Sequence, residues 1–343
     1  MTKTQQTEPG SPTSMVALTR RSLAGAILGA GVLAAGPRTA WAAEKATYLL
    51  PAPPFLPAFS PFQIAQKQGY YAAEGVELTF QAGRGGADVA KQVGLGNAEI
   101  GGGVGDTSMI VRAQGLPVRA VALLGHRPIF QVAIRKAAGI RDIAGLKGKK
   151  IGVIAFQDTS FYALLGTLAA LGLKRNDVQI QAVGAAGMTQ LMISGDLDAI
   201  MATPEWGITI EDANVPLDYH PIDQLFPAMA QAILTSDKLI SERPALVRGV
   251  VRGTLKAIRD VIADPAAATR VYVSAVPQHA GKEAEIERIL RRYAEQVYAT
   301  PRPEDLGRFD AERIRTVQKF YMENGIIQTA VPVPELYTNE FVG

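Results

Sequence analysis

After residue 42, short runs of aliphatic and β-branched residues alternate with longer segments whose apolar positions recur every three or four residues. The short runs predict strands and the longer segments predict amphipathic helices. Glycine, proline, serine or aspartate stands at most of the boundaries between them, as expected for turns and helix ends. This alternation predicts an α/β fold with mainly parallel sheets.

The predicted strands are the short apolar runs at 46–51, 76–81, 99–104, 118–124, 151–155, 178–183 and 198–201. Helices are predicted at 60–67, 87–93, 106–115, 160–171 and 187–193, with a short one from Pro204. After about Ile233 the pattern changes to charged amphipathic helices near 243–263, 265–273, 282–300 and 311–324. No further strand is expected there. Acidic and basic residues alternate along these helices, which is typical of a solvated outer layer.

Two segments share a local pattern of a helix, a glycine turn and an acidic residue entering a strand. They read VAKQVGLGNAEI from Val89 and MTQLMISGDLDAI from Met188. Any βαβ unit produces such punctuation. The separation of 99 residues between the two starts, however, favours two similar lobes.

The first 42 residues have the pattern of an export signal. Arg20 and Arg21 precede an apolar run of 13 residues at 23–35, which is shorter than the roughly 20 residues that cross a bilayer. Ala40-Trp41-Ala42 fits an A-x-A cleavage site. The pattern resembles a twin-arginine signal, with a general secretory signal as the alternative. Export to the periplasm and cleavage after Ala42 are therefore expected.

Composition removes several classes of function. Four of the 35 basic residues and one of the 32 acidic residues lie within 1–42, which leaves 31 of each in the remainder. Bulk charge therefore gives no reason to expect nucleic-acid or anionic-membrane binding. The chain has no cysteine, and its three histidines lack metal-ligand spacing. No Gly-x-Ser-x-Gly nucleophile elbow is present. We therefore expect no cofactor, no metal and no catalysis.

Candidate ligand-binding residues follow from the order of the elements. In open α/β sheets a ligand binds beyond the carboxyl ends of the strands, where helix N-termini present free N–H groups. The residues of interest lie in the loops at those ends and beside them. They are Phe59, Ser60, Arg84, Gly85, Gly86, Thr107, Ser108, Arg127, Asp158, Thr159, Ser160, Met188, Glu205 and Trp206.

These residues fit two kinds of ligand. Arg84, in a glycine-rich loop, and Arg127 suit a carboxylate or sulfonate. Trp206 suits stacking on a flat ligand, while Glu205 and Asp158 suit an amino group. Each has a structural alternative as well: Arg84 as a solvated turn residue, Asp158 as a helix cap, and Trp206 as a core residue with Glu205 in the first helical turn. The sequence leaves the charge of the ligand open.

Five segments carry a family resemblance when taken in order behind the signal. They lie at 61–65, 68–78, 96–101, 146–153 and 195–200. In this order they resemble bacterial ABC-importer substrate-binding proteins of the sulfonate, nitrate and taurine type, a family that also includes binders of thiamine pyrimidine precursors. Asn97 and Glu99 stand where that family usually has a small residue and an aspartate. Both precede a predicted buried strand, so we expect the difference to be structural.

The resemblance implies a class II periplasmic-binding fold with a ligand cleft between two α/β lobes. Lobe 1 would comprise 43–128 and 236–343, lobe 2 would comprise 129–235, and 124–134 and 229–235 would cross between them. The implied function is solute binding in the periplasm for an ABC importer, by a monomer that delivers a small organic anion to an inner-membrane permease. A binder of an aminopyrimidine or related nitrogen heterocycle is the alternative. A ligand-sensing domain is the second alternative. An enzyme on the same fold is the least favoured, because the cysteine-rich motif of such enzymes is missing.

Overall fold

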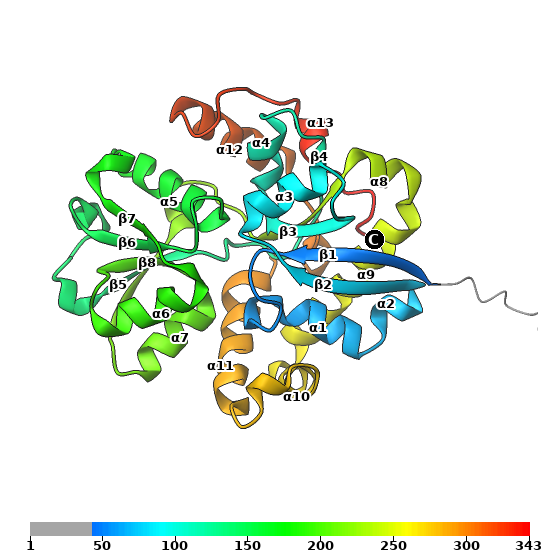
Figure 1. Ribbon diagram of the computed structural model, residues 1–343, viewed down its shortest axis with the longest axis horizontal. Helices are drawn as coiled ribbons and strands as arrows, with labels where there is room; N and C mark the ends of the chain where they lie inside the picture. Colours follow the sequence, from blue (N-terminus) through cyan, green and yellow to red (C-terminus); the bar gives the residue numbers. More distant parts are fainter. Residues whose placement is uncertain (1–42) are drawn as a thin grey trace, which may run out of the picture. The chain divides into compact units, whose positions relative to one another are not determined.

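The structure is a computed structural model that describes residues 43–343 (Figure 1). The predicted export signal lies outside these residues. The strands form two five-stranded sheets, with the orders β2-β1-β3-β10-β4 and β7-β6-β8-β5-β9. We call the part built on the first sheet lobe 1 and the part built on the second sheet lobe 2. Two α/β lobes were expected, and this fold class is confirmed.

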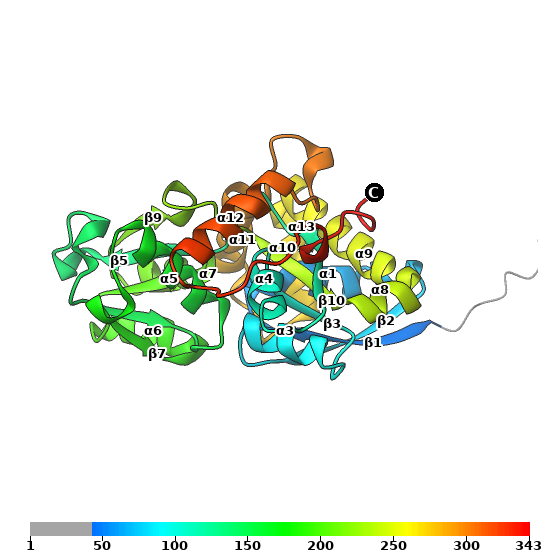
Figure 2. The same cartoon turned by 90° about the horizontal axis from the view of Figure 1, so that it is seen from above.

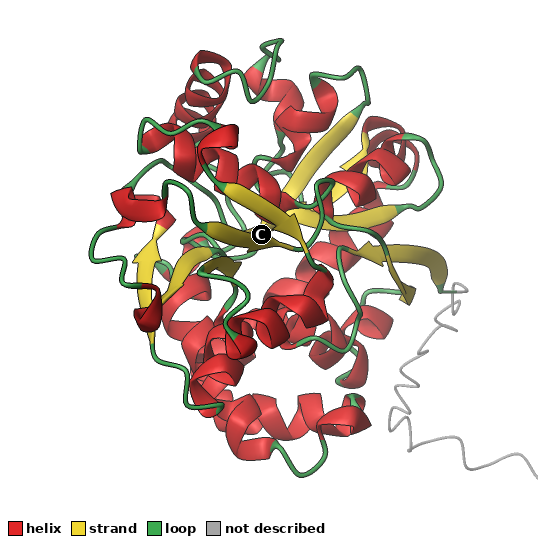
Figure 3. Cartoon of the chain, turned by 60° about the vertical axis from the view of Figure 1, so that its left-hand side comes forward, coloured by secondary structure: helices red, strands yellow, loops and turns green. Residues whose placement is uncertain are grey.

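The strands of the two sheets have the following bounds. Sheet 1 contains β1 (Glu44–Leu50), β2 (Val76–Ala82), β3 (Ile100–Val104), β4 (Val118–Leu123) and β10 (Gln231–Ser236). Sheet 2 contains β5 (Gln131–Arg135), β6 (Lys150–Val153), β7 (Gln179–Ala182), β8 (Ala199–Ala202) and β9 (Leu217–Pro221). Figure 3 shows both sheets in yellow with helices packed around them.

The helices follow the predicted order closely. Those that precede β10 are α1 (Ser60–Lys67), α2 (Tyr70–Ala73), α3 (Gly86–Gly94), α4 (Thr107–Arg112), α5 (Thr159–Ala170), α6 (Gly184–Ser194) and α7 (Pro204–Asp212). Those that follow it are α8 (Asp237–Glu242), α9 (Pro244–Ala263), α10 (Pro265–Ala275), α11 (Glu283–Tyr293), α12 (Ala311–Glu323) and α13 (Val333–Leu336). The predicted helix at 282–300 is divided, because α11 ends at Tyr293 and a π-helical turn η7 (Ala294–Tyr298) follows.

Both sheets are mixed, so the prediction of mainly parallel sheets was wrong in part. In sheet 1, β1 is parallel to β2 and β3, whereas β10 is antiparallel to β3 and β4. Sheet 2 repeats this arrangement, with β6 parallel to β7 and β8, and β5 antiparallel to β8 and β9. In each lobe, the antiparallel strand is the one by which the chain enters from the other lobe.

Strand β10 also corrects the second crossing segment. Residues 229–235 were expected to cross between the lobes, but most of them form β10 within sheet 1. The return crossing therefore lies before Gln231, and residues 231–235 of the expected lobe 2 pair in sheet 1. Strands β5 and β9 were not predicted as strands. Strand β5 fell within the expected first crossing at 124–134.

Helix α12 lies beside both crossing segments (Figure 2). Its Arg313 guanidinium donates one hydrogen bond to the His126 carbonyl at 2.8 Å and another to the Ala228 carbonyl. His126 belongs to the first crossing and Ala228 to the second. The ring of Phe226, also in the second crossing, stacks on Phe320 of α12 with 5.3 Å between centroids. Helix α12 thus contacts both crossing segments, which we call the hinge.

None of the helices within residues 43–343 has the length and apolar character needed to cross a membrane.

Glu99 has a structural role, since one of its carboxylate oxygens accepts a 2.8 Å hydrogen bond from the Thr47 N–H of β1. The Asn97 side chain donates to the Gln92 side-chain oxygen at 2.7 Å.

Candidate ligand-binding site

Three cavities lie between the lobes and share lining residues. The central cavity has a volume of about 40 Å³. The hinge-side cavity, about 280 Å³, shares Ile129 and Phe130 with it. The outer cavity, about 340 Å³, shares Leu56, Glu205 and Trp206 with it. The cavities are therefore consecutive along the interface.

The central cavity is the one that the fold topology favours as a ligand site. It is lined at the carboxyl ends of β1, β3, β6 and β8 and near the starts of α1, α5 and α7, where α/β folds bind ligands. Its lining comprises Pro51, Ala52, Leu56, Ala58, Phe59, Gly103, Val104, Ile129, Phe130, Ile154, Asp158, Thr159, Thr203, Glu205, Trp206 and Gln231. Residues from both lobes and from the first crossing segment contribute.

Five of the predicted site residues line this cavity: Phe59, Asp158, Thr159, Glu205 and Trp206. Their contact with a ligand remains a prediction. The sequence reasoning missed the residues that the crossing and return segments supply, above all Phe130 and Gln231. A signal for them existed, since the predicted crossings had to border the cleft.

The glycine-rich loop of lobe 1 packs on the start of α5 in lobe 2. The Gly86 N–H donates to an Asp158 carboxylate oxygen at 3.1 Å, and the Asp88 N–H donates to the Gln157 carbonyl at 3.2 Å. A Cβ atom on Gly85 would lie 2.6 Å from the Asp158 Cα, and the φ of Gly85 is 105°. Only glycine fits this approach at low cost. The lobes are therefore in direct contact.

Asp158 has two structural tasks in this contact. One carboxylate oxygen caps α5 by accepting from the Ser160 N–H at 2.8 Å, as the capping alternative predicted, and the other accepts from Gly86. The side chain is buried, and this burial raises its pKa. Ser160 supports the same turn, because its hydroxyl accepts from the Ile154 N–H at 3.1 Å.

Glu205 presents an unpaired oxygen at the central and outer cavities. Its Oε2 accepts a hydrogen bond from the Tyr293 hydroxyl at 2.5 Å. Its Oε1 is buried and receives no hydrogen bond of normal geometry from the described residues, and the Thr203 hydroxyl is likewise without such a bond. Burial raises the pKa of Glu205. The Thr203 side chain and the Ala58 backbone nevertheless lie near enough to this carboxylate to lower its pKa in part. A buried acceptor without a partner is costly, so a donor on a ligand would satisfy it.

Trp206 lines both the central and the outer cavity, although only 5% of its surface is exposed. Phe59 and Phe130 are also buried at the central cavity. Aromatic rings in such a position suit a flat ligand. No lysine or arginine lines the central cavity in the part of the chain that the structure describes.

The remaining predicted residues do not line the central cavity. Arg84 is exposed, and Met188 is fully buried in lobe 2, where its sulfur lies near Gly152. The Thr107 hydroxyl accepts from the Val104 N–H at 2.9 Å. Ser60 and Ser108 are fully buried, with hydroxyls that have no partner among residues 43–343.

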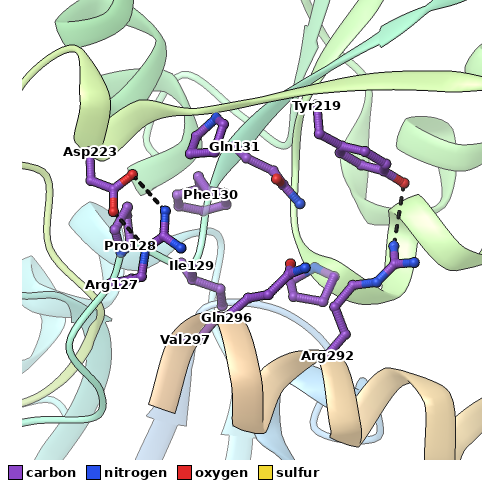
Figure 4. Close-up of a pocket in the computed structure, with 12 residues that line it drawn as sticks. Arg127, Pro128, Ile129, Phe130, Gln131, Tyr219, Asp223, Arg292, Gln296 and Val297 are labelled. Atoms are coloured by element: carbon purple, nitrogen blue, oxygen red, sulfur yellow. Dashed lines mark hydrogen bonds and ion pairs between the residues drawn. The ribbon is translucent and has the colours of Figure 1, made fainter. Parts of the chain in front are cut away.

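Arg127 lines the hinge-side cavity instead (Figure 4). Its Nε donates to one Asp223 oxygen at 2.7 Å and its Nη2 donates to the other at 3.2 Å. This bidentate pair explains why the pKa of Arg127 is raised. Arg127 thus lines a different cavity from Asp158 and Glu205, and Arg84 is exposed beside Gly85.

The comparison with solved structures defines the class of fold. The alkanesulfonate-binding protein SsuA of Xanthomonas axonopodis pv. citri bound to MOPS is 17% identical with a TM-score of 0.68, over 86% of this chain and 98% of that one. The periplasmic nitrate-binding protein NrtA of Synechocystis PCC 6803 is 12% identical with a TM-score of 0.63, over 87% and 86%. At these identities the similarity establishes the fold, which is that of the periplasmic binding proteins.

The family follows from sequence. The family model described as NMT1/THI5 like matches residues 56–268, and the chain belongs to this family. Riboflavin-binding protein RibY of Chloroflexus aurantiacus is 26% identical over 289 residues, covering 83% of this chain and 82% of that protein. The 4-amino-5-hydroxymethyl-2-methylpyrimidine phosphate synthase THI5 of Saccharomyces cerevisiae is 28% identical over 259 residues, covering 68% and 72%. Fold and family fit a ligand-binding protein of the ABC-importer type.

Proposed function

We propose that the protein is the periplasmic solute-binding component of an ABC importer and captures a flat nitrogen heterocycle that carries hydrogen-bond donors. The observation that carries this proposal is the Oε1 atom of Glu205, buried without a described partner beside Trp206. A ring amino group or ring N–H would pair with that oxygen, while the ring would contact the aromatic lining.

The lining of the central cavity gives less support to a small organic anion of the sulfonate, nitrate, taurine or aromatic-acid type. Its charged side chains are Asp158 and Glu205, both acidic. An anion would find no lysine or arginine there to offset their charge, but only backbone N–H groups near the starts of α5 and α7 and neutral side-chain donors such as the Thr203 hydroxyl. The relatives are consistent with a heterocycle, since riboflavin and an aminopyrimidine stand in the names of RibY and THI5.

Binding of such a ring requires the lobes to separate. A cavity of about 40 Å³ has room for a few water molecules but not for a heterocycle. The lobes would open about the two crossing segments and close again on the solute, because only the closed arrangement brings residues of both lobes to it. The hydrogen bond between Gly86 and Asp158 holds the lobes together in the structure and would break on opening.

We propose binding without catalysis, although THI5 is named a synthase. The chain has no cysteine, and the described lining of the central cavity contains no histidine or lysine. Such a lining lacks the cysteine, histidine and lysine side chains that often serve as nucleophile or base. The proposed route is export by a twin-arginine signal, cleavage after Ala42, and action as a monomer with an inner-membrane permease. We propose the lobe boundaries predicted from the sequence with one change: lobe 2 ends before Gln231 instead of at residue 235.

The test is a titration of the purified protein with riboflavin, an aminopyrimidine, taurine, an alkanesulfonate, nitrate and an aromatic acid. Calorimetry would give affinities, and the melting temperature would report stabilisation. We expect a heterocycle to bind and Glu205→Gln and Trp206→Phe each to weaken it about tenfold or more. Asp212→Asn is the control, since Asp212 is an exposed residue of the same helix α7. Binding of sulfonates or nitrate alone would contradict the proposal.

A further inference from the structure

The hinge-side cavity has a lining chemistry opposite to that of the central cavity. It is walled by Arg127–Gln131 of the first crossing and β5, by Tyr219, Pro221 and Asp223 of lobe 2, and by Arg292 and Gln296. Three of the lining residues are prolines, at 128, 204 and 221, and a proline has no backbone N–H group. Its volume of about 280 Å³ is close to the lower end of the roughly 300–1,000 Å³ typical of small-molecule sites.

Both arginines retain unused donors in this cavity. Arg127 uses Nε and Nη2 for Asp223, which leaves Nη1 without a partner in the described part of the chain. Arg292 donates from Nη2 to Glu211 at 3.1 Å and from Nη1 to the Tyr219 hydroxyl at 3.4 Å, so its Nε is left. The Arg127 guanidinium is thus held by one partner group and the Arg292 guanidinium by two, and each keeps N–H groups without a partner beside the cavity.

Two side-chain amides lie between these arginines. Figure 4 shows Gln131 and Gln296 in the space between the Arg127–Asp223 pair and the Tyr219–Arg292 pair. Neither amide has a hydrogen-bond partner among residues 43–343. The cavity therefore offers two guanidinium groups and two amide NH₂ groups. Arg127 is already paired with Asp223 and Arg292 with Glu211, so what remains available to a ligand is hydrogen-bonding capacity.

We propose that the hinge-side cavity is a second binding site, and that it takes a small organic carboxylate. A carboxylate accepts hydrogen bonds through both oxygens and fits guanidinium and amide donors. Ile129 and Phe130 separate this site from the central cavity, because they line both. The two sites would thus differ in hydrogen-bonding character, and Arg127, one of the two candidate arginines, belongs to the hinge-side site.

The test uses malonate, succinate and glutarate as probes, with sodium chloride at matched ionic strength as the reference. Calorimetry on the purified protein is expected to show saturable binding of one of these acids that chloride does not reproduce. Arg292→Gln should weaken it about tenfold or more, given the strength of charge-assisted hydrogen bonds. Gln296→Leu should weaken it as well, and this variant breaks no ion pair of the fold.

Arg288→Gln is the matched control. Arg288 lies one turn earlier on α11 and also joins that helix to α7, through Asp212, but it does not line the cavity. It should leave carboxylate affinity unchanged. No binding of any of the acids, or equal losses in Arg288→Gln and Arg292→Gln, would overturn the second site. Loss of carboxylate binding in Trp206→Phe would place the acid in the central cavity, and would overturn the second site while the binding function of the central cavity still stands.

Discussion

The carboxylate of Glu205 on α7 accepts a hydrogen bond from the hydroxyl of Tyr293 on α11, with 2.5 Å between the two oxygens. Glu205 belongs to lobe 2, whereas α11 packs on α9 and α10 beside lobe 1. Both side chains are buried. This bond therefore joins the two lobes at the candidate site and fixes the direction of the carboxylate.

Replacing Tyr293 with phenylalanine should lower the free energy of unfolding by about 1–3 kcal/mol, because Glu205 would lose its buried donor. Urea unfolding monitored by circular dichroism measures this. Tyr48→Phe is the control, since the Tyr48 hydroxyl is buried with no described partner and its removal should cost little. Equal losses in both variants would show that the loss in Tyr293→Phe does not come from the bond to Glu205.

Glu205→Gln should change how stability depends on pH. Burial raises the pKa of Glu205 above its ordinary value of 4.5, so between these two values the folded protein binds more protons than the unfolded chain. The stability that this group contributes is present below pH 4.5 and is lost as the pH rises through the raised pKa. Unfolding measured from pH 4.5 to 8 should show Glu205→Gln gaining stability relative to the unmodified protein. A constant difference across that range would contradict the assignment.

Gly86→Ala should hold the lobes apart. The new Cβ would lie 2.6 Å from the Thr159 Cγ2 across the interface, which is closer than packed atoms approach. Small-angle scattering is expected to show a larger radius of gyration and calorimetry a weaker affinity for the solute. Gly145→Ala is the control, because its Cβ would meet only Ile140, at 3.2 Å. An unchanged radius of gyration would mean that the interface adapts.

Arg313→Met should loosen the hinge. The variant removes the donors to the His126 and Ala228 carbonyls and is expected to cost about 2 kcal/mol of stability, since hydrogen bonds from charged groups are worth roughly 1.5–3 kcal/mol. Hydrogen exchange should become faster in the crossing segments. Arg315→Met, on the exposed side of the same helix, should leave exchange there unchanged. Unaltered exchange in Arg313→Met would show that the stack of Phe226 on Phe320 is enough to hold the crossing segments in place.

Changing Arg20 and Arg21 together to lysine should prevent processing, because the twin-arginine route reads that pair. The measurement is the ratio of precursor to mature chain in fractionated cells. Lys3→Arg is the control, because it exchanges lysine and arginine at equal charge upstream of the pair. Normal processing of the lysine variant would favour the general secretory route.

The sequence pattern predicts most elements correctly where proline, glycine or a capping residue marks their ends. Helix α1 spans Ser60–Lys67 as predicted, because Pro61 stands in its first turn and Gly69 adopts a positive φ after it. Strand β9 escaped prediction because its sequence, LDYHP, is polar and it lies at the edge of sheet 2. Strands β5 and β10 follow the crossings, and only the tertiary arrangement shows where a crossing becomes a strand.

The candidate site was predictable to the level of loops. The rule of strand ends selected Asp158 and Trp206, which line the central cavity. It gave no information on where a loop side chain points. The structure shows that Arg84 is exposed and that Arg127 lines another cavity. The bond between Gly86 and Asp158 spans 72 residues. Such a contact depends on the placement of two lobes, which no local pattern encodes.

The contact of Arg313 with both crossing segments has a consequence for the order of folding. All ten strands of the two sheets are complete at Ser236, whereas the guanidinium that joins the crossings belongs to residue 313. During synthesis from the N-terminus, both sheets leave the ribosome before the residue that fixes their hinge. The strands of both lobes are therefore present in the chain before the residue that joins the crossings, and a chain truncated before α12 would lack this connection between them.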